Sequence, residues 1–496
     1  MADRDNRGLA PWTRRGFSAA LGAALVPVGC GQPSSGQAPA RALAAQERLL
    51  AEFAGAYPDE LAATGRVHEV ELVAAPTTLE VGEQPAMQVW AYNGQVPGPT
   101  LRVRLGDTLK ARFVNLLPME TTIHWHGVRV PNGMDGVPHV TQPPVPPGGT
   151  FDYEFTPKDA GTYWFHPHVR GSEQVERGLH GVLIVEDAAP SPYSEDVLWV
   201  LDDWRLDATG QIDGKFNTRH DLAHDGRWGR MRTVNGRSRE VLRVRPGERI
   251  RLRMLNCANG RAVVPHFGSL RAKLLAVDGK YLRAPIDMPR FEMAPGNRLD
   301  VDITFDLASE RIPVQDLFSP SRPQVLAAIE VDGEPVDTPR FESPAAAHVP
   351  RWAEGLDVPM HHDYRMSARR GGEHGIEWMF DNQPFTGHDA HPISMDLVRH
   401  RFHRVRFSND SGRLHPIHMH GTFFRVLARN GELVDEPFFR DTVLVRGRET
   451  VDLGLVPTDV GKWMVHCHIL EHAESGMMTL VEVHEGTPGR ASADSA

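Results

Sequence analysis

The stretch NGQVPGPTLRVRLGDTLKARFVN, from Asn93 to Asn115, contains two short runs in which apolar and polar residues alternate, joined by a glycine turn. Apolar residues at every second position predict β-strands with one buried face. The pattern returns as NGRSREVLRVRPGERIRLRMLN at Asn235–Asn256, and more loosely as DNQPF at 381–385 followed by MDLVRHRFHRVRFSN at Met395–Asn409. Three copies of one motif predict three similar all-β units, each a sandwich or a barrel.

The composition is that of a globular protein and restricts the classes of function. The chain has 496 residues, 41% of them hydrophobic, and a formal net charge of −10. Nucleic acid demands a basic protein face, so we expect no nucleic-acid partner. The three cysteines, Cys30, Cys257 and Cys467, are too few for a disulfide framework. The 25 histidines are numerous, and many of them cluster at short, fixed spacing.

The histidine clusters follow the first and third copies of the repeat. The first copy runs into HWHG at 124–127 and HPH at 166–168, and the third into HPIHMHG at 415–421 and HCH at 466–468. The middle copy reaches only the lone His266, which we interpret as structural. We therefore expect the outer units to carry the chemistry and the middle one to act as a spacer.

Each H-x-H places two imidazoles on one face of a strand, about 7 Å apart at a rise of ~3.3 Å per residue. Four such pairs occur: His124/His126, His166/His168, His418/His420 and His466/His468. Eight neutral imidazoles suit copper or zinc, but zinc alone has no redox chemistry.

Cys467 lies between His466 and His468, so its sulfur is expected on the opposite face of that strand. Together with His415, His472 and Met477 it forms a set of two histidines, one cysteine and a weak thioether, which is the pattern of blue-copper electron-transfer sites. Peptide bonds join this cysteine to both neighbouring histidines, which predicts a short covalent route for electrons between two metal sites.

The motifs HWHG, HPH, HPIHMHG and HCHILEHAESGM, in this order, closely resemble those of the multicopper oxidases, a family that includes laccases and bacterial cuprous oxidases. The resemblance covers about residues 67–485 and implies three cupredoxin-like Greek-key β-sandwich domains and four copper ions. We accordingly expect a signal and linker at 1–45, a short helical lead-in at 46–66, and cupredoxin domains at 67–190, 191–345 and 346–496.

The resemblance also implies a role for each matching residue. The type 1 copper ligands would be His415, Cys467, His472 and Met477, and the type 2 ligands His124 and His418. The type 3 pair of coppers would be held by His126, His166, His168, His420, His466 and His468. A reductant would give single electrons to the type 1 copper, and the trinuclear cluster, between the first and third domains, would reduce dioxygen to water.

Carboxylates near these motifs are candidates for proton supply and ligand orientation. Asp135, in NGMDG, matches an acidic proton donor of relatives; the alternative is a turn residue before Gly136. Asp441, in RDTVLV, is either a partner that orients a ligand imidazole or an ordinary residue at the start of a strand. Glu471 and Glu474 are expected to face substrate or solvent.

The chain departs from the cuprous oxidases of the family, many of which carry a methionine-rich insert before the third domain. Residues 345–395 contain only four methionines, and Asp410 is the only acidic residue in DSGRL before His415. His361 and His362 would bind copper weakly or lie in a solvated loop, Ala473 replaces an acidic residue seen in some relatives, and Trp463 is expected in the core.

These departures favour a laccase-like oxidase acting on phenols or similar one-electron donors. The alternatives are cuprous oxidation in copper tolerance and, in a different class, a copper-free scaffold protein. Scaffold relatives lose ligands, whereas this chain keeps all ten histidines, Cys467 and Met477.

The N-terminus predicts export. Arg14 and Arg15 precede the apolar run SAALGAALVPVG, which resembles a twin-arginine signal. About 12 apolar residues are too few for the ~20 that span a bilayer, so we expect a monomeric periplasmic protein without a transmembrane span. Processing is expected either after APA at 38–40 or at Cys30 with lipid attachment, although Pro27 fits a lipoprotein site poorly.

Overall fold

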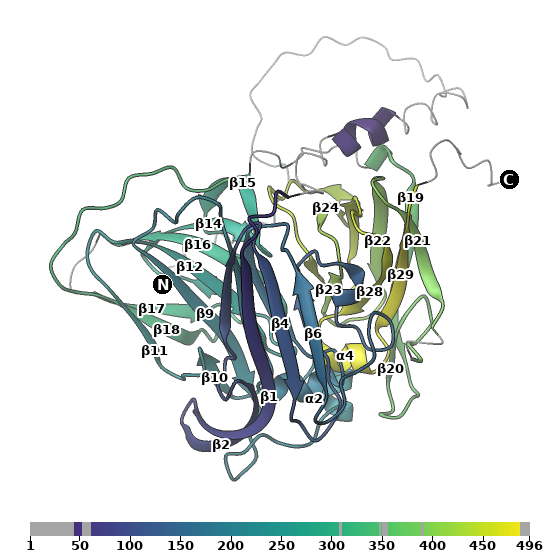
Figure 1. Ribbon diagram of the computed structural model, residues 1–496, viewed down its shortest axis with the longest axis horizontal. Helices are drawn as coiled ribbons and strands as arrows, with labels where there is room; N and C mark the ends of the chain where they lie inside the picture. Colours follow the sequence, from purple (N-terminus) through teal and green to yellow (C-terminus); the bar gives the residue numbers. More distant parts are fainter. Residues whose placement is uncertain are drawn as a thin grey trace, which may run out of the picture.

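The computed structural model describes residues 44–51, 61–306, 310–346, 349, 356–387 and 391–486. Within these ranges the chain forms three β-sandwiches, which Figure 1 shows with the middle one to the left, the third to the right, and β1, β4 and β6 of the first in front between them. Residues 44–51 are helical and 61–66 are not; residues 52–60 of the expected helical lead-in, Cys30 and the expected signal lie outside the described residues.

Each sandwich is built from two sheets. In the first sandwich, one sheet has the strand order β2 (Gln84–Tyr92), β1 (Val67–Val81), β4 (Thr108–Asn115), β6 (Thr150–Phe155). The other sheet has the order β3 (Thr100–Arg104), β8 (Gly181–Glu186), β7 (Gly161–His166), β5 (His124–His126). In the second sandwich, one sheet has the order β10 (Met231–Val234), β9 (Glu195–Trp204), β12 (Arg249–Asn256), β16 (Arg298–Thr304), β14 (Arg271–Val277), β15 (Lys280–Asp287). The other has the order β11 (Glu240–Val244), β18 (Gln324–Val331), β17 (Glu310–Asp316), β13 (Pro265–His266).

In the third sandwich, one sheet has the order β20 (Glu377–Phe380), β19 (Met360–Arg369), β22 (His403–Asn409), β27 (Thr450–Leu455), β24 (Phe424–Arg429), β25 (Glu432–Leu433). The other has the order β21 (Ile393–Val398), β29 (Met478–His484), β28 (Gly461–Cys467), β23 (His415–Met419), β26 (Thr442–Val445). Short helices connect the strands: η1 (Asn132–Met134), α2 (Gly171–Glu176), α3 (Arg219–Ala223) and α4 (Leu470–Glu474). No helix among the described residues has the length and apolarity needed to cross a membrane.

The repeated motif occupies the same place in each sandwich. Its first strand pairs in parallel with the strand that ends the unit (β3 with β8, β11 with β18, β21 with β29). Its second strand pairs in parallel with the strand that begins one sheet (β4 with β1, β12 with β9, β22 with β19). The same connections therefore recur three times.

A glycine turn between two alternating runs suggests a hairpin, but the two strands of each motif do not pair with one another. β3 and β4 belong to opposite sheets, and so do β6 and β7. The turn at Gly106, with φ of +90°, carries the chain from one sheet to the other. Both strands still alternate because their apolar residues, such as Val103 and Phe113, meet in the core between the sheets.

Candidate metal centres

The H-x-H pairs lie on neighbouring antiparallel strands in the two outer sandwiches. In the first, β5 pairs with β7 so that His124 is opposite His166. In the third, β23 pairs with β28 so that His418 is opposite His466, and Ile417 is opposite Cys467. Since facing residues share a face of the sheet, this register sends the cysteine away from the histidines beside it.

The eight histidines of the four pairs converge where the two outer sandwiches meet. The ring of His124 stacks on that of His420 with centroids 3.8 Å apart, and the ring of His126 on that of His418 at 3.7 Å. Three triads have their ligand atoms within 4.8 Å of one another: His126/His166/His468, His168/His420/His466 and His124/His126/His418. Together, the first two triads contain the six histidines expected to hold the type 3 pair.

The donor atoms of this cluster fit metal ions. The following buried ring nitrogens have no hydrogen-bond partner among the described residues: Nε2 of His124, His166 and His418, Nδ1 of His126, and both nitrogens of His468. Burial lowers the pKa of His126, His166, His420 and His468 well below the ordinary value. The rings are therefore neutral, and a bound metal would use lone pairs that otherwise remain buried and unsatisfied.

A second donor set lies on the other face of β28. The Sγ of Cys467 is 3.6 Å from Nδ1 of His415 and 3.8 Å from Nδ1 of His472, and these two nitrogens are 3.2 Å apart. The Nε2 of His472 donates to the carbonyl of His224 at 2.7 Å, which leaves Nδ1 free to bind a metal. Burial raises the pKa of the Cys467 thiol, so its thiolate requires a compensating cation.

Met477 is buried in the core of the third sandwich together with Cys467 and Ile417. It follows α4, and its carbonyl accepts a hydrogen bond from the amide of Cys467 at 3.0 Å. This contact holds the chain beside the cysteine, where an axial thioether is expected.

Two aspartates orient the cluster histidines, and each crosses from one outer sandwich to the other. The carboxylate of Asp135 accepts from Nδ1 of His420 at 2.8 Å, and its carbonyl from Nδ1 of His124 at 2.8 Å. The carboxylate of Asp441 lies 3.2 Å from Nε2 of His126, and its carbonyl accepts from Nδ1 of His418 at 2.9 Å. Neither residue merely forms a turn or starts a strand; both direct ring nitrogens toward the cluster.

The expectation for Glu471, next to His472, was wrong. Glu471 is fully buried, accepting from Nδ2 of Asn259 and from the amide of Arg227, and burial raises its pKa to about 7. Glu474 accepts from Ser172 and Asn217. The Glu471 carboxylate faces neither substrate nor solvent because α4 packs against loops of the first and middle sandwiches, whereas Glu474 is partly exposed and lines a surface hollow.

Other predicted residues have ordinary structural contacts. His361 and His362 bond to the carbonyl of Asp396 and the carboxylate of Asp381, and Asp410 pairs with Arg365. His266 accepts from the amide of Gly268, which confirms a structural role, and Trp463 is buried in the core as expected.

Some residues at the sites had no signal in the sequence. The ring of Trp378 packs on that of His472 with centroids 4.4 Å apart, and its Nε1 donates to the carbonyl of Leu222. Arg298 of the middle sandwich donates to Asp441 at 3.0 Å. They come from segments far away in the chain, so no local spacing reveals them.

The middle sandwich also supplies a glycine that packs directly against two histidines of the cluster. Gly296 has φ of +87°, and a Cβ there would lie 3.0 Å from Cε1 of His126 and 3.1 Å from Cδ2 of His468. The absent side chain therefore gives these two rings their room, and the middle unit does more than act as a spacer.

We expect Gly296→Ala to lower metal occupancy of the cluster and to slow turnover by about tenfold or more, since a ~1 Å misplacement can reduce rate up to ~10²-fold. Metal analysis and dioxygen uptake measure both. The control is Gly431→Ala, because Gly431 has φ of +80° but nothing within 4 Å of the added Cβ. Equal losses in the two variants would mean that backbone strain alone is responsible.

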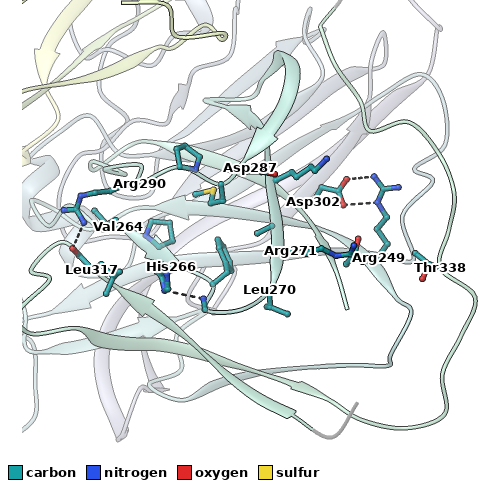
Figure 2. Close-up of a pocket in the computed structure, with 18 of the residues that line it drawn as sticks. Arg249, Val264, His266, Leu270, Arg271, Asp287, Arg290, Asp302, Leu317 and Thr338 are labelled. Atoms are coloured by element: carbon teal, nitrogen blue, oxygen red, sulfur yellow. Dashed lines mark hydrogen bonds and ion pairs between the residues drawn. The ribbon is translucent and has the colours of Figure 1, made fainter. Parts of the chain in front are cut away.

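Two hollows differ in their relation to these centres. One of about 490 Å³ is lined by His166, His168 and His466 together with Glu120 and Glu474, so it reaches the cluster from the surface. Another, of about 1110 Å³, lies on the middle sandwich, as Figure 2 shows, and its lining includes the Arg249–Asp302 ion pair. None of the predicted ligands lines the larger hollow, whereas three histidines of the cluster line the smaller one.

Comparisons with known proteins agree with this geometry. The chain matches family models described as multicopper oxidase over residues 74–190, 195–311 and 357–487. It is 32% identical to a crystal structure of a multi-copper oxidase from Pseudomonas thermotolerans, with 84% of this chain and 99% of that one covered and a TM-score of 0.75.

Two relatives match this chain over most of their own length. The multicopper oxidase MmcO of Mycobacterium tuberculosis is 26% identical over 465 residues, covering 84% of this chain and 88% of that protein. The copper resistance protein A homolog of Pseudomonas syringae pv. tomato is 23% identical over 566 residues, covering 86% and 94%. Fold and donor sets together define a copper-dependent oxidoreductase. The chain belongs to the multicopper oxidase family, and its cofactor is copper.

Proposed function

We propose that the protein takes single electrons at the His415/Cys467/His472 set and reduces dioxygen to water at the eight-histidine cluster, with four coppers in all. The observation that carries this proposal is the convergence of buried, unpartnered imidazole nitrogens next to a separate cysteine-containing set. Copper bound there would supply the one-electron redox steps and the four-electron reduction of dioxygen.

The polypeptide contributes the connection and the environment. Cys467 is joined through its peptide bonds to His466 and His468, which provides a covalent route from one donor set to the other. Asp135 and Asp441 hold ring nitrogens toward the cluster. The hollow at His168 supplies a path for dioxygen to enter and for water to leave.

We expect Asp135→Asn to slow dioxygen reduction by about 10–100-fold, the range typical for losing a partner of a metal ligand. The main-chain carbonyl would still accept from His124 and the amide oxygen from His420, but the amide carries no charge and cannot deliver a proton. Stopped-flow mixing measures the two half-reactions separately, and reduction of the blue centre by the donor should be unaffected. The control is Asp152→Asn, an exposed residue of β6; unchanged reoxidation in Asp135→Asn would contradict this role.

The surroundings of His472 favour a small electron donor, with cuprous ion ahead of a phenol. His472 is fully buried, its Nε2 is occupied by the carbonyl of His224, and Trp378 covers one face of its ring. An aromatic donor therefore has no direct contact with the ligand ring. The name of the Pseudomonas syringae relative, copper resistance protein A homolog, points in the same direction. Laccase-like oxidation of phenols remains the second candidate.

Dioxygen uptake by the copper-loaded enzyme, measured side by side with Cu(I) and with hydroquinone, tests this proposal. We expect uptake with both donors and a higher kcat/KM for Cu(I). Uptake with hydroquinone alone would make the enzyme a laccase, and no uptake with either donor would contradict oxidase activity. Twin-arginine export, processing after APA at 38–40 or at Cys30, and the monomeric state remain predictions.

A further inference from the structure

A pair of exposed histidines lies directly over the type 1 donor set. His220 belongs to α3, and His224 follows its last residue, four positions along the chain. Their rings have centroids 4.2 Å apart and planes inclined by 30°. His224 caps the helix with extended backbone angles, so it is the ring contact that places both side chains on one face, where both can reach a single metal ion.

The donor atoms of this pair are available. The Nδ1 of His224 donates to the carbonyl of His220 at 2.8 Å, which leaves a lone pair on its Nε2. Among the described residues, neither that Nε2 nor a ring nitrogen of His220 has a hydrogen-bond partner. The neighbouring histidines His361 and His362 differ from this pair, because the Nε2 of each already has a hydrogen-bond partner.

The segment that carries the pair is fixed to the type 1 site. The carbonyl of His224 accepts from Nε2 of His472 at 2.7 Å, and the carbonyl of Leu222 accepts from Nε1 of Trp378 at 2.9 Å. The carboxylate of Asp225 accepts from the amide of Leu414, next to His415, at 3.0 Å. The peptide of His224 therefore joins the exposed pair to a type 1 ligand through a single hydrogen bond.

We infer that His220 and His224 form the docking site for the cuprous ion, whose electron enters His472 through the carbonyl of His224. This inference rests on the proposed use of Cu(I) as reductant. Each Cu(I) ion loses one electron and leaves as Cu(II), and four such ions with four protons balance one dioxygen reduced to two waters. Two imidazoles suit Cu(I), whereas Cu(II) prefers a tetragonal set of four donors, so the product is held less well.

The test uses copper-loaded His220→Ala, His224→Ala and the double variant, with Cu(I) supplied as its acetonitrile complex. His224→Ala retains the carbonyl that bonds to His472. We expect the KM for Cu(I) to rise by about tenfold or more, the lower end of the effect of losing a metal's partner. The ratio of Cu(I) turnover to hydroquinone turnover should fall by the same factor. His266→Ala, an exposed histidine of the same sandwich, is the matched control.

Binding of Ag(I), which has the charge of Cu(I) but does not donate an electron, gives a second readout. Calorimetry on the copper-loaded enzyme should detect one Ag(I) site that the double variant lacks, and Ag(I) should compete with Cu(I). A wild-type enzyme that oxidises Cu(I), with unchanged KM and Ag(I) binding in the variants, would overturn the docking site and leave the proposed function intact. A wild-type enzyme that oxidises only hydroquinone would overturn the proposed reductant itself. Equal loss of both turnovers would assign the pair a purely structural role.

Discussion

Replacing Cys467 with serine is expected to abolish the blue absorbance and to reduce turnover with any donor by at least about a hundredfold. Loss of a residue that merely supports a ligand already costs up to ~100-fold, and Cys467 is both a donor and the covalent link between the sites. A serine hydroxyl is a poor substitute for a thiolate as a copper ligand. Copper held by the eight cluster histidines should largely remain, because none of them is changed.

Absorbance spectra, metal analysis and dioxygen uptake on the same preparation measure these effects. Cys257→Ser provides the matched control, since Cys257 is also buried, its Sγ donates to the carbonyl of Leu201, and it is not a predicted metal ligand. The control should keep its colour and turnover. Turnover retained in Cys467→Ser would refute the electron route through this residue.

Replacing Arg298 with methionine is expected to lower the free energy of unfolding by about 3–5 kcal/mol, the usual result of removing one partner from a buried ion pair. Arg298 is fully buried and donates to the carboxylate of Asp441 and to the carbonyl of Thr162. Burial opposes ionisation of Asp441, but Arg298 and His418 outweigh it and lower the pKa of this carboxyl. Without the guanidinium, Asp441 would lose its buried ion-pair partner, and Asp278 would lose one of the two arginines that favour its ionised form.

The same variant should lose cluster copper, because Asp441 also bonds to His126. Urea unfolding and metal analysis measure the two effects. Arg311→Met removes an exposed arginine that pairs with Glu330, and it should cost less than about 1 kcal/mol. If the two variants were equally stable, the buried network would contribute no more than a surface ion pair.

Much of the metal site was predictable because a strand repeats every two residues. That period alone separates Cys467 from the histidines on either side of it, and the register of β28 with β23 confirms that Cys467 and His466 face opposite sides of the sheet. The all-β fold was predictable for the same reason. The partners of each strand were not, because alternation is identical in a hairpin and in two strands that cross between sheets, as β3 and β4 do.

The surroundings of the site depend on contacts that local patterns do not encode. His224 lies 248 residues before His472, and Arg298 lies 143 residues before Asp441. Both come from the middle sandwich, which holds no predicted ligand and therefore shows no sign in its sequence of contributing to the sites. Spacing can identify donor atoms, but only the docking of the three sandwiches identifies what covers and orients them.

The exchange of aspartates between the outer sandwiches has a consequence for biogenesis. Asp135 of the first unit holds His420 of the third, and Asp441 of the third holds His126 of the first. Neither unit can shape its share of the cluster before the other has arrived. A nascent chain that has not yet completed its last strands would offer imidazoles but no place where the metal could stay. Stable incorporation of copper thus serves as a checkpoint that only the finished polypeptide passes.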